Sequence, residues 1–169
     1  YEFTNDLGML RQYFSIRNQA YKDVHGYDIN GHDVYDDISE TLVVKSGSKC
    51  VGGARVTIKF PGEDVKLPME TNSFKLQDVF PELDLKRIVH SEVSRVALLK
   101  EFADGQIIQD IYSLLAKVKG NETNCDIAFF ATYKIHARKV RQVCSKLGYK
   151  MVTIDDVCPE HFKISDKVR

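Results

Sequence analysis

Charged and hydroxyl side chains stand where a buried strand is expected, in the stretch from His90 to Leu99. Its second half, Val96 to Leu99, is a continuous apolar run, which is typical of a strand buried on both faces. In the first half, alternation places Glu92 and Ser94 on one face and sends Arg95 to the other. A buried carboxylate and a buried guanidinium each cost several kcal/mol unless they are paired. We therefore predict either a bulge that re-aims Arg95 or a separate partner for each charge, with a purely structural ion pair as the alternative.

A second arginine, Arg17, falls within the apolar stripe of a predicted helix. The helix is capped by Thr4, Asn5 or Asp6 and extends to about Lys22, and its stripe also holds Leu10, Phe14 and Tyr21. An arginine in such a stripe requires a carboxylate. The nearest supply is the segment from Gly26 to Glu40, which contains no Lys or Arg but has Asp28, Asp33, Asp36, Asp37 and Glu40. The alternative is a solvated acidic loop.

The elements that must position these residues follow from local patterns. Residues 40–45 and 50–60 are predicted strands, joined by a turn at 46–49, and Gly52-Gly53 marks a bulge or a close approach to the backbone. A long connection over 61–87, with a short helix near 74–80, is typical of a binding loop or lid. Helices are then expected over 105–119 and 134–147, the latter ended by Gly148, and strands over 124–132 and 149–154.

This order of elements predicts an α/β fold with a mixed sheet, antiparallel early and partly parallel late. We expect one domain over residues 1–169, because the length and the 43% hydrophobic content suit a single core. The 24 basic and 24 acidic residues balance, so composition gives no field for nucleic acid. The four cysteines lie far apart without a CxxC pair, which argues against a metal site. The apolar runs are too short to span a membrane, and the N-terminus shows no leader pattern. We therefore expect a cytoplasmic protein.

One region is strongly basic. Between residues 133 and 150 there is no Asp or Glu, but the chain carries Lys134, Arg138, Lys139, Arg141, Lys146 and Lys150. A solvated amphipathic helix explains part of this pattern, but ordinary surfaces intersperse both signs. A phosphate-bearing or acidic protein partner is the simpler explanation.

Four segments together resemble a known family. They are His32-Asp33-Val34-Tyr35-Asp36, Gly52-Gly53-Ala54-Arg55, Phe74 and Glu92-Val93-Ser94-Arg95. In order and spacing they are similar to the acyl-homoserine lactone autoinducer synthases and to the related long-chain N-acyl amino acid synthases. The resemblance extends from about Arg17 to Lys150.

The resemblance implies the GNAT acyltransferase fold, a three-layer α/β fold. Its mixed, mostly antiparallel sheet is splayed at the middle strand and flanked by helices. It also implies that six polar residues shape the amine and acyl sites: Arg17, Asp33, Asp36, Arg55, Glu92 and Arg95.

Departures from the lactone synthases favour the N-acyl amino acid branch. Tyr27 stands where a Trp is usual, Gly31 where a Glu is usual, and Val56-Thr57-Ile58 replaces a Leu-Leu-Pro-Thr run. The acetyl-CoA enzymes of this fold carry a glycine-rich pyrophosphate loop, whereas residues 99–105 provide a single glycine. We therefore expect an acyl carrier protein as acyl donor, with no bound cofactor. Its pantetheine phosphate would lie near Lys100 and Gly105, and the carrier would dock on Lys134, Arg138, Lys139 and Arg141.

The expected reaction is attack of an amino acid's α-amine on the thioester of the carrier. Glu92 is the expected base, and Ser94 with a freed backbone N–H would meet the oxyanion. Arg55 or Arg95 would hold the substrate carboxylate, and Asp33 and Asp36 would order Arg17 or receive the ammonium. A lactone synthase that uses S-adenosylmethionine and a non-catalytic module that binds acyl carrier protein remain as alternatives.

Overall fold

The computed structural model describes residues 1–26, 28–29, 31–70, 73–132, 134–154 and 157. Its contacts divide the chain into two compact units. The first comprises Tyr1–Thr57 and Val93–Ile111, and the second comprises Ile58–Glu92 and Tyr112–Arg169. Strands β3 and β4 each contribute residues to both units, and the single domain expected over residues 1–169 stays a prediction.

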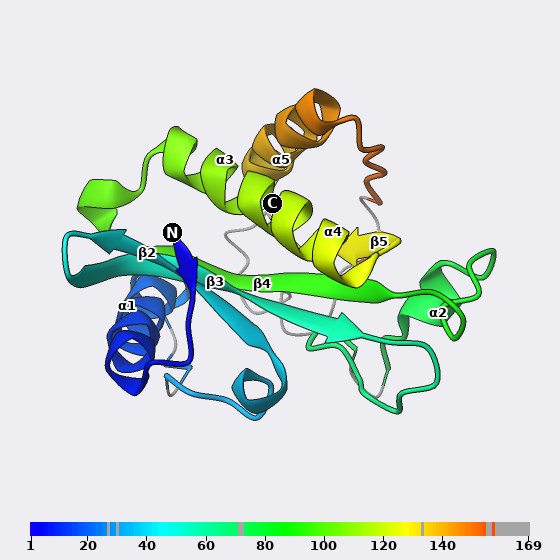
Figure 1. Ribbon diagram of the computed structural model, residues 1–169, viewed down its shortest axis with the longest axis horizontal. Coiled ribbons are helices and arrows are strands. Elements are labelled where there is room, and N and C mark those ends of the chain that lie inside the picture. Colours follow the sequence, from blue (N-terminus) through cyan, green and yellow to red (C-terminus); the bar gives the residue numbers. More distant parts are fainter. Residues whose placement is uncertain (27, 30, 71–72, 133, 155–156, 158–169) are drawn as a thin grey trace. The chain divides into compact units, whose positions relative to one another are not determined.

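Five strands form one mixed sheet in the order β1-β2-β3-β4-β5 (Figure 1). Their bounds are β1 Glu2–Phe3, β2 Glu40–Ser46, β3 Lys49–Lys59, β4 His90–Leu98 and β5 Ile127–Phe129. Pairs β1/β2 and β2/β3 are antiparallel, and β4/β5 is parallel. The predicted change from antiparallel to parallel pairing is therefore confirmed.

The helices are α1 Leu7–His25, α2 Leu76–Val79, α3 Gly105–Leu114, α4 Gly120–Thr123 and α5 Lys134–Leu147. Short 3-10 turns lie at Asp36–Ile38 and Lys100–Phe102, and a π-helical segment, Leu115–Lys119, joins α3 to α4. Asp6 caps α1, as the sequence predicts, because its side chain accepts the Met9 N–H at 2.8 Å. No helix within the described ranges is both long enough and apolar enough to cross a bilayer.

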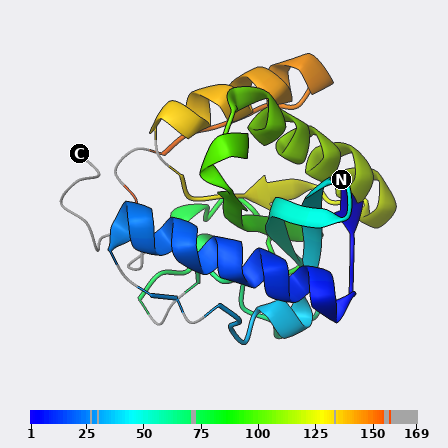
Figure 2. The same ribbon diagram turned by 90° about the vertical axis from the view of Figure 1, so that its left-hand side faces the viewer.

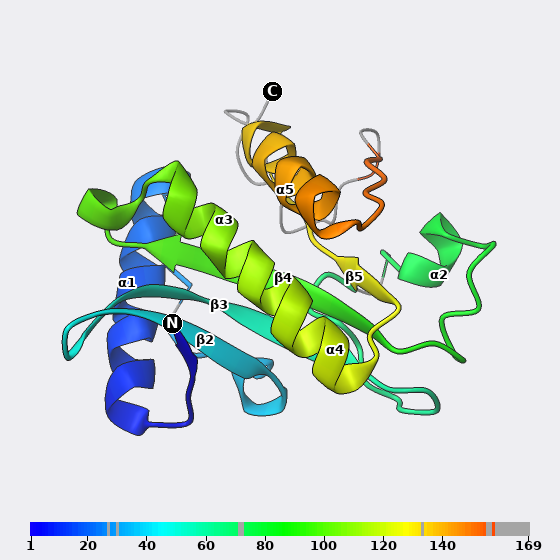
Figure 3. The same cartoon turned by 45° about the horizontal axis from the view of Figure 1, so that its top comes forward.

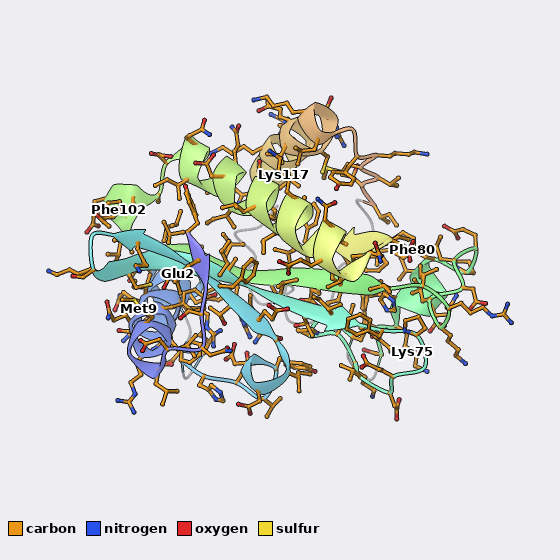
Figure 4. All side chains as sticks on the ribbon, in the orientation of Figure 1. Glu2, Met9, Lys75, Phe80, Phe102 and Lys117 are labelled. Atoms are coloured by element: carbon orange, nitrogen blue, oxygen red, sulfur yellow. The ribbon has the colours of Figure 1, made fainter. Side chains whose placement is uncertain are left out.

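In the first unit, α1 and the Asp36–Ile38 turn lie on the same side of β2 and β3 (Figures 1 and 2). The core here combines Tyr13 and Ile16 of α1 with Val43, Cys50 and Ala97 of the strands. Met9, labelled in Figure 4, packs against it.

The two glycines of β3 are required by close packing. A Cβ on Gly53 would collide with the carbonyl oxygen of Leu42 and come within 3.0 Å of the Tyr13 ring. A Cβ on Gly52 would lie 2.5 Å from the carbonyl oxygen of Ala97 on β4. The predicted close approach to this backbone is therefore confirmed, and the approaching groups are the protein's own strands and helix.

We expect Gly53→Ala to lower the free energy of unfolding by about 1–3 kcal/mol, the usual cost of overpacking a core. Urea denaturation of the variant measures the loss. Lys49→Ala, at the exposed end of the same strand, serves as the control and should stay within about 0.5 kcal/mol of the wild type. An unchanged midpoint for Gly53→Ala would mean that α1 and β2 can move apart at no cost.

In the second unit, the connection after β3 forms half of a core. Leu67, Met69, Leu76 and Leu85 are buried and pack with Phe129 of β5. Phe80, at the end of α2, contacts Phe129 with ring centroids 5.3 Å apart, and α2 lies beside β5 (Figure 3). Part of this connection is therefore packed into the second unit, and its predicted role as a binding loop or lid stays a prediction.

Two sequence predictions are wrong. Residues 149–154 are not a strand, and most of their side chains are exposed, because β-branched residues form a strand only where a neighbour pairs with them. In β4 the more buried half is His90–Val93, while Ser94, Arg95 and Val96 are half-buried. The apolar run of residues 96–99 predicts the more buried half, but the polar half of the strand is the more enclosed.

Candidate functional site

Five charged residues of the first unit form one connected group, called here the Arg/Asp network: Arg17, Asp33, Asp36, Arg55 and Arg95. Arg17 meets Asp36 with two parallel hydrogen bonds of 2.8 and 2.7 Å. Arg55 bridges the two carboxylates, at 2.5 Å from Asp33 and 3.1 Å from Asp36. Arg95 reaches the second oxygen of Asp33 at 3.2 Å. The carboxylate predicted for Arg17 is therefore present, and it comes from the expected acidic segment.

The acidic half of the network is held by its own backbone. The Asp33 N–H donates to the Asp36 carboxylate at 2.7 Å, and the Asp36 N–H donates to the Asp33 carbonyl at 2.9 Å. The Asp33 side chain also accepts the Tyr35 N–H at 3.0 Å. These hydrogen bonds form an Asx-type turn, which orients both carboxylates independently of their contacts with the arginines.

Burial falls along the network from one end to the other. The side chains of Arg17, Arg55 and Asp36 are 0%, 1% and 2% exposed. Those of Arg95 and Asp33 are 23% and 24% exposed. Three guanidiniums face two carboxylates, so the network carries one surplus positive charge, and its solvent-accessible end is the Arg95–Asp33 pair.

Two buried guanidinium nitrogens lack a partner among the described residues, Nε of Arg17 at the enclosed end and Nε of Arg95 at the accessible end. A carboxylate has about four acceptor positions, and those of Asp36 are filled by Arg17 twice, by Arg55 and by the Asp33 N–H. Within the described residues, Oδ2 of Asp33 accepts from Arg95 alone. The buried Nε of Arg95 has no partner there either. An acceptor and a donor thus stay open on neighbouring side chains.

The backbone of Arg95 is unusual. Its φ is +57°, a left-handed conformation that costs a non-glycine residue roughly 1–2 kcal/mol. The buried Tyr13 hydroxyl donates to the Arg95 carbonyl at 2.6 Å, and the Arg95 guanidinium lies 5.2 Å from the centre of the Tyr21 ring. The predicted distortion of β4 is confirmed, and each charge of the strand also has its own partner.

Sequence reasoning missed Tyr13 as part of this site. Its neighbour Phe14 covers Arg17 at 4.8 Å, and Tyr35 lies 5.6 Å from Arg55, so each arginine of the network has an aromatic ring within cation–π range. The available signal was a run of aromatic residues on the same helix face as Arg17.

The pKa of each carboxylate in the network lies below its ordinary value. Burial acts to raise the pKa of Asp33, but attraction to Arg55 and Arg95 outweighs it, and the pKa lies below its ordinary value. Burial likewise acts to raise the pKa of Asp36, and the hydrogen bonds from Arg17 and from the Asp33 N–H lower it overall.

A lowered folded pKa gives a stabilisation that is complete above the unfolded value of about 3.9 and is lost as the pH falls through the folded value. We therefore expect the network to contribute a constant free energy of unfolding between pH 7 and 5 and to lose this contribution below pH 4. Urea denaturation at a series of pH values measures it. The loss below pH 4 should be smaller in Asp33→Asn, and an equally steep loss in that variant would contradict the assignment.

Ser94 joins the network through its hydroxyl. Its Oγ accepts from Nε of Arg55 at 3.2 Å, which leaves the hydroxyl proton to donate elsewhere. The Ser94 oxygen is thus held by Arg55, while its proton is available for a hydrogen bond. The role of Ser94 as a donor to an oxyanion stays a prediction.

Glu92 belongs to the second unit and is buried, with 3% of the residue exposed. Its Oε2 accepts the Met69 N–H at 2.6 Å, so one carboxylate oxygen holds the backbone of the preceding connection. Its role as a base stays a prediction.

At the predicted phosphate position near Lys100 and Gly105, the carboxylate of Asp104 already occupies N–H groups of the helix N-terminus. Helix α3 begins at Gly105, and the Asp104 carboxylate accepts the N–H groups of Gln106 and Ile107 at 2.8 Å each. Lys100 is exposed in the preceding turn. A phosphate at this helix end must compete with Asp104, and the position stays a prediction.

The basic helix has the predicted bounds. α5 buries Val140 and Val143, while Arg138, Arg141 and Lys146 are exposed and Lys139 is half-buried. The side chain of Lys134 lies outside the described set. Among the described residues, no group of three or more His, Cys, Asp and Glu could hold a metal ion.

Neither the protein-family models nor the curated proteins contain a match to this sequence. Solved structures do match over most of the chain. A ribosomal-protein-alanine N-acetyltransferase from Brucella melitensis is 10% identical, covers 94% of this chain and 98% of its own, and gives a TM-score of 0.58. An acetyltransferase from Clostridium acetobutylicum, solved with acetyl-CoA, is 13% identical over 93% of both chains, with a TM-score of 0.54.

A transcriptional regulator from Bacillus halodurans matches as well, with 18% identity, a TM-score of 0.55 and coverage of 93% of this chain and 99% of its own. At these identities the likeness concerns the fold. The chain has the GNAT-like α/β fold, as predicted, and its chemistry has to be argued from its own residues.

Proposed function

We propose that the protein is an N-acyltransferase that moves a long-chain fatty acyl group from an acyl carrier protein thioester to the α-amine of an amino acid. The observation that carries this proposal is the partly exposed Arg95–Asp33 pair at the end of the otherwise buried Arg/Asp network. An amino acid is a zwitterion, with a carboxylate and an ammonium a few ångströms apart. The pair offers one group of each opposite sign at 3.2 Å.

Arg95 is the arginine suited to the substrate carboxylate. Arg55 is almost fully enclosed, and its hydrogen bonds go to Asp33, Asp36 and Ser94. Arg95 keeps an unpartnered buried Nε within the described residues and a side chain that is partly exposed. A guanidinium binds carboxylates through two parallel hydrogen bonds. Asp33, with its open acceptor position, receives the substrate ammonium.

The reaction has three requirements. One proton must leave the ammonium for a base, and Glu92 is proposed for this step. The amine nitrogen then bonds to the thioester carbonyl carbon while a donor, proposed to be Ser94 with a backbone N–H near the distorted Arg95, meets the oxyanion. The carbon–sulfur bond breaks, and the thiolate takes up one of the two protons left on the nitrogen, while the other stays on the amide product.

The basic surface of α5 favours a carrier protein over free coenzyme A as donor. From residue 127 to 154 the chain has no acidic residue, and Arg138 and Arg141 are exposed on consecutive turns of α5. Acyl carrier proteins are acidic, and complementary charge steers such encounters. No cofactor is proposed beyond the phosphopantetheine of the carrier, which arrives with the substrate.

Mass spectrometry of lipid extracts from cells that overproduce the protein tests the proposal, with cells carrying the empty vector as control. N-acyl amino acids should accumulate, and their masses identify both the amine and the chain length. Acyl-homoserine lactones instead would show that S-adenosylmethionine is the amine substrate. The absence of any acylated amine would contradict an enzymatic role.

A further inference from the structure

Two carboxylates hold the backbone of the packed connection in the second unit. Oε2 of Glu70 accepts the Leu67 N–H at 3.1 Å, and Oε1 accepts the Leu76 N–H at 3.3 Å. The Glu70 N–H in turn donates to the Leu67 carbonyl at 2.8 Å. One side chain therefore links the backbone of Leu67 to that of Leu76, the first residue of α2; Figure 4 labels Lys75 and Phe80 at either end of this helix.

Met69 lies in the loop between Leu67 and Leu76, and its N–H is the group that donates to Glu92 at 2.6 Å. Its side chain and those of Leu67 and Leu76 are buried in one core. The position of the Met69 N–H is therefore set by the loop, and the loop is set by Glu70. The hydrogen bond fixes one oxygen of Glu92 and favours the charged form of its carboxylate.

We propose that Glu70 is a positioning residue for Glu92: by accepting the N–H groups of Leu67 and Leu76 it keeps the Met69 N–H on the Glu92 carboxylate. This inference rests on the proposed function in giving Glu92 the role of base. In this account the connection over 61–87 holds the carboxylate of Glu92 in place through the Met69 N–H.

The chain offers a matched control. Glu63 also uses its carboxylate to accept a backbone N–H, that of Phe60 at 2.9 Å, but in an exposed turn of the same unit. Glu70→Ala removes both acceptors of the loop, and Glu70→Gln keeps one of them and serves if the alanine variant does not fold. Glu63→Ala removes a hydrogen bond of the same kind, which has no connection to Met69.

Two measurements on the full chain test the proposal: hydrogen exchange of the 67–76 peptide, and the pH dependence of kcat with long-chain acyl carrier protein. Both Glu70 variants should exchange faster over 67–76, lose roughly tenfold in kcat with little change in KM for the amine, and shift the acidic limb of the profile to higher pH. Glu63→Ala should stay within about twofold of the wild type, as expected of an exposed turn.

Faster exchange with an unchanged kcat and pH profile would overturn the proposal, because Glu70 would then be only structural. Unchanged exchange would overturn it as well, because the loop would not depend on Glu70. If the wild type transfers no acyl group, the proposed function fails and the role of Glu70 fails with it. Hydrogen exchange would then still report separately whether the loop depends on Glu70.

Discussion

Asp36→Asn is expected to lower the free energy of unfolding by about 3–5 kcal/mol, the cost of breaking a buried ion pair by removing one partner. Asp36 is the central acceptor of the Arg/Asp network and takes hydrogen bonds from Arg17 and Arg55. The amide cannot accept on its nitrogen side and carries no charge, so the enclosed Arg17 loses its carboxylate partner and Arg55 keeps only Asp33. For a chain of this size the melting temperature should fall by roughly 6–20 °C.

The neighbouring residue provides the control. Asp37 is 69% exposed and pairs only with His32 on the surface among the described residues. Asp37→Asn should change the free energy of unfolding by less than about 0.5 kcal/mol. Equal melting temperatures for the two variants would contradict the account of the network, because burial would then make no difference to the same substitution.

Glu92→Gln is expected to reduce turnover by about a hundredfold or more while leaving the protein folded. The amide oxygen of glutamine can still accept the Met69 N–H, so the contact seen at Glu92 is retained. What the variant loses is the ability to take a proton. Steady-state kinetics with an amino acid and acyl carrier protein measure kcat.

Glu63→Gln, in the exposed turn before the packed connection, is the matched control and should retain normal turnover. Near-normal turnover of Glu92→Gln would remove it from the role of base. Its carboxylate would then serve only to hold the Met69 backbone.

Some of this architecture could be predicted from local signals. The need of Arg17 for a carboxylate, the distortion at Arg95 and the bounds of α5 all follow from residues within a few positions of one another or from a charge in an apolar stripe. The identity of the partner could be narrowed to one acidic segment, but the choice of Asp36 over Asp37 could not be made. That choice depends on which carboxylate the 33–36 turn directs inward.

The misses share a physical cause. Residues 149–154 have the β-branched and aromatic content of a strand, but a strand requires a pairing neighbour, which the local sequence does not encode. The packing of residues within 61–87 could not be predicted either, because it depends on Glu70 and on buried leucines far apart in sequence. Tyr13 was passed over because its role depends on the carbonyl of a residue 82 positions away.

The order of burial in the network also bears on selectivity among amines. Arg95 is held before any ligand arrives, by Asp33 at its guanidinium and by Tyr13 at its carbonyl. Immobilising a long side chain on binding costs about 0.5–1.5 kcal/mol, and here that entropy is already lost when the chain folds. Under the proposed function, an amine without a carboxylate gains nothing from this arrangement and leaves Arg95 with Asp33 as its only charged partner among the described residues. Discrimination against simple alkylamines would therefore come from the guanidinium of Arg95, which can still bind an anion. An acyl acceptor that carries its own carboxylate would be favoured without any further contact.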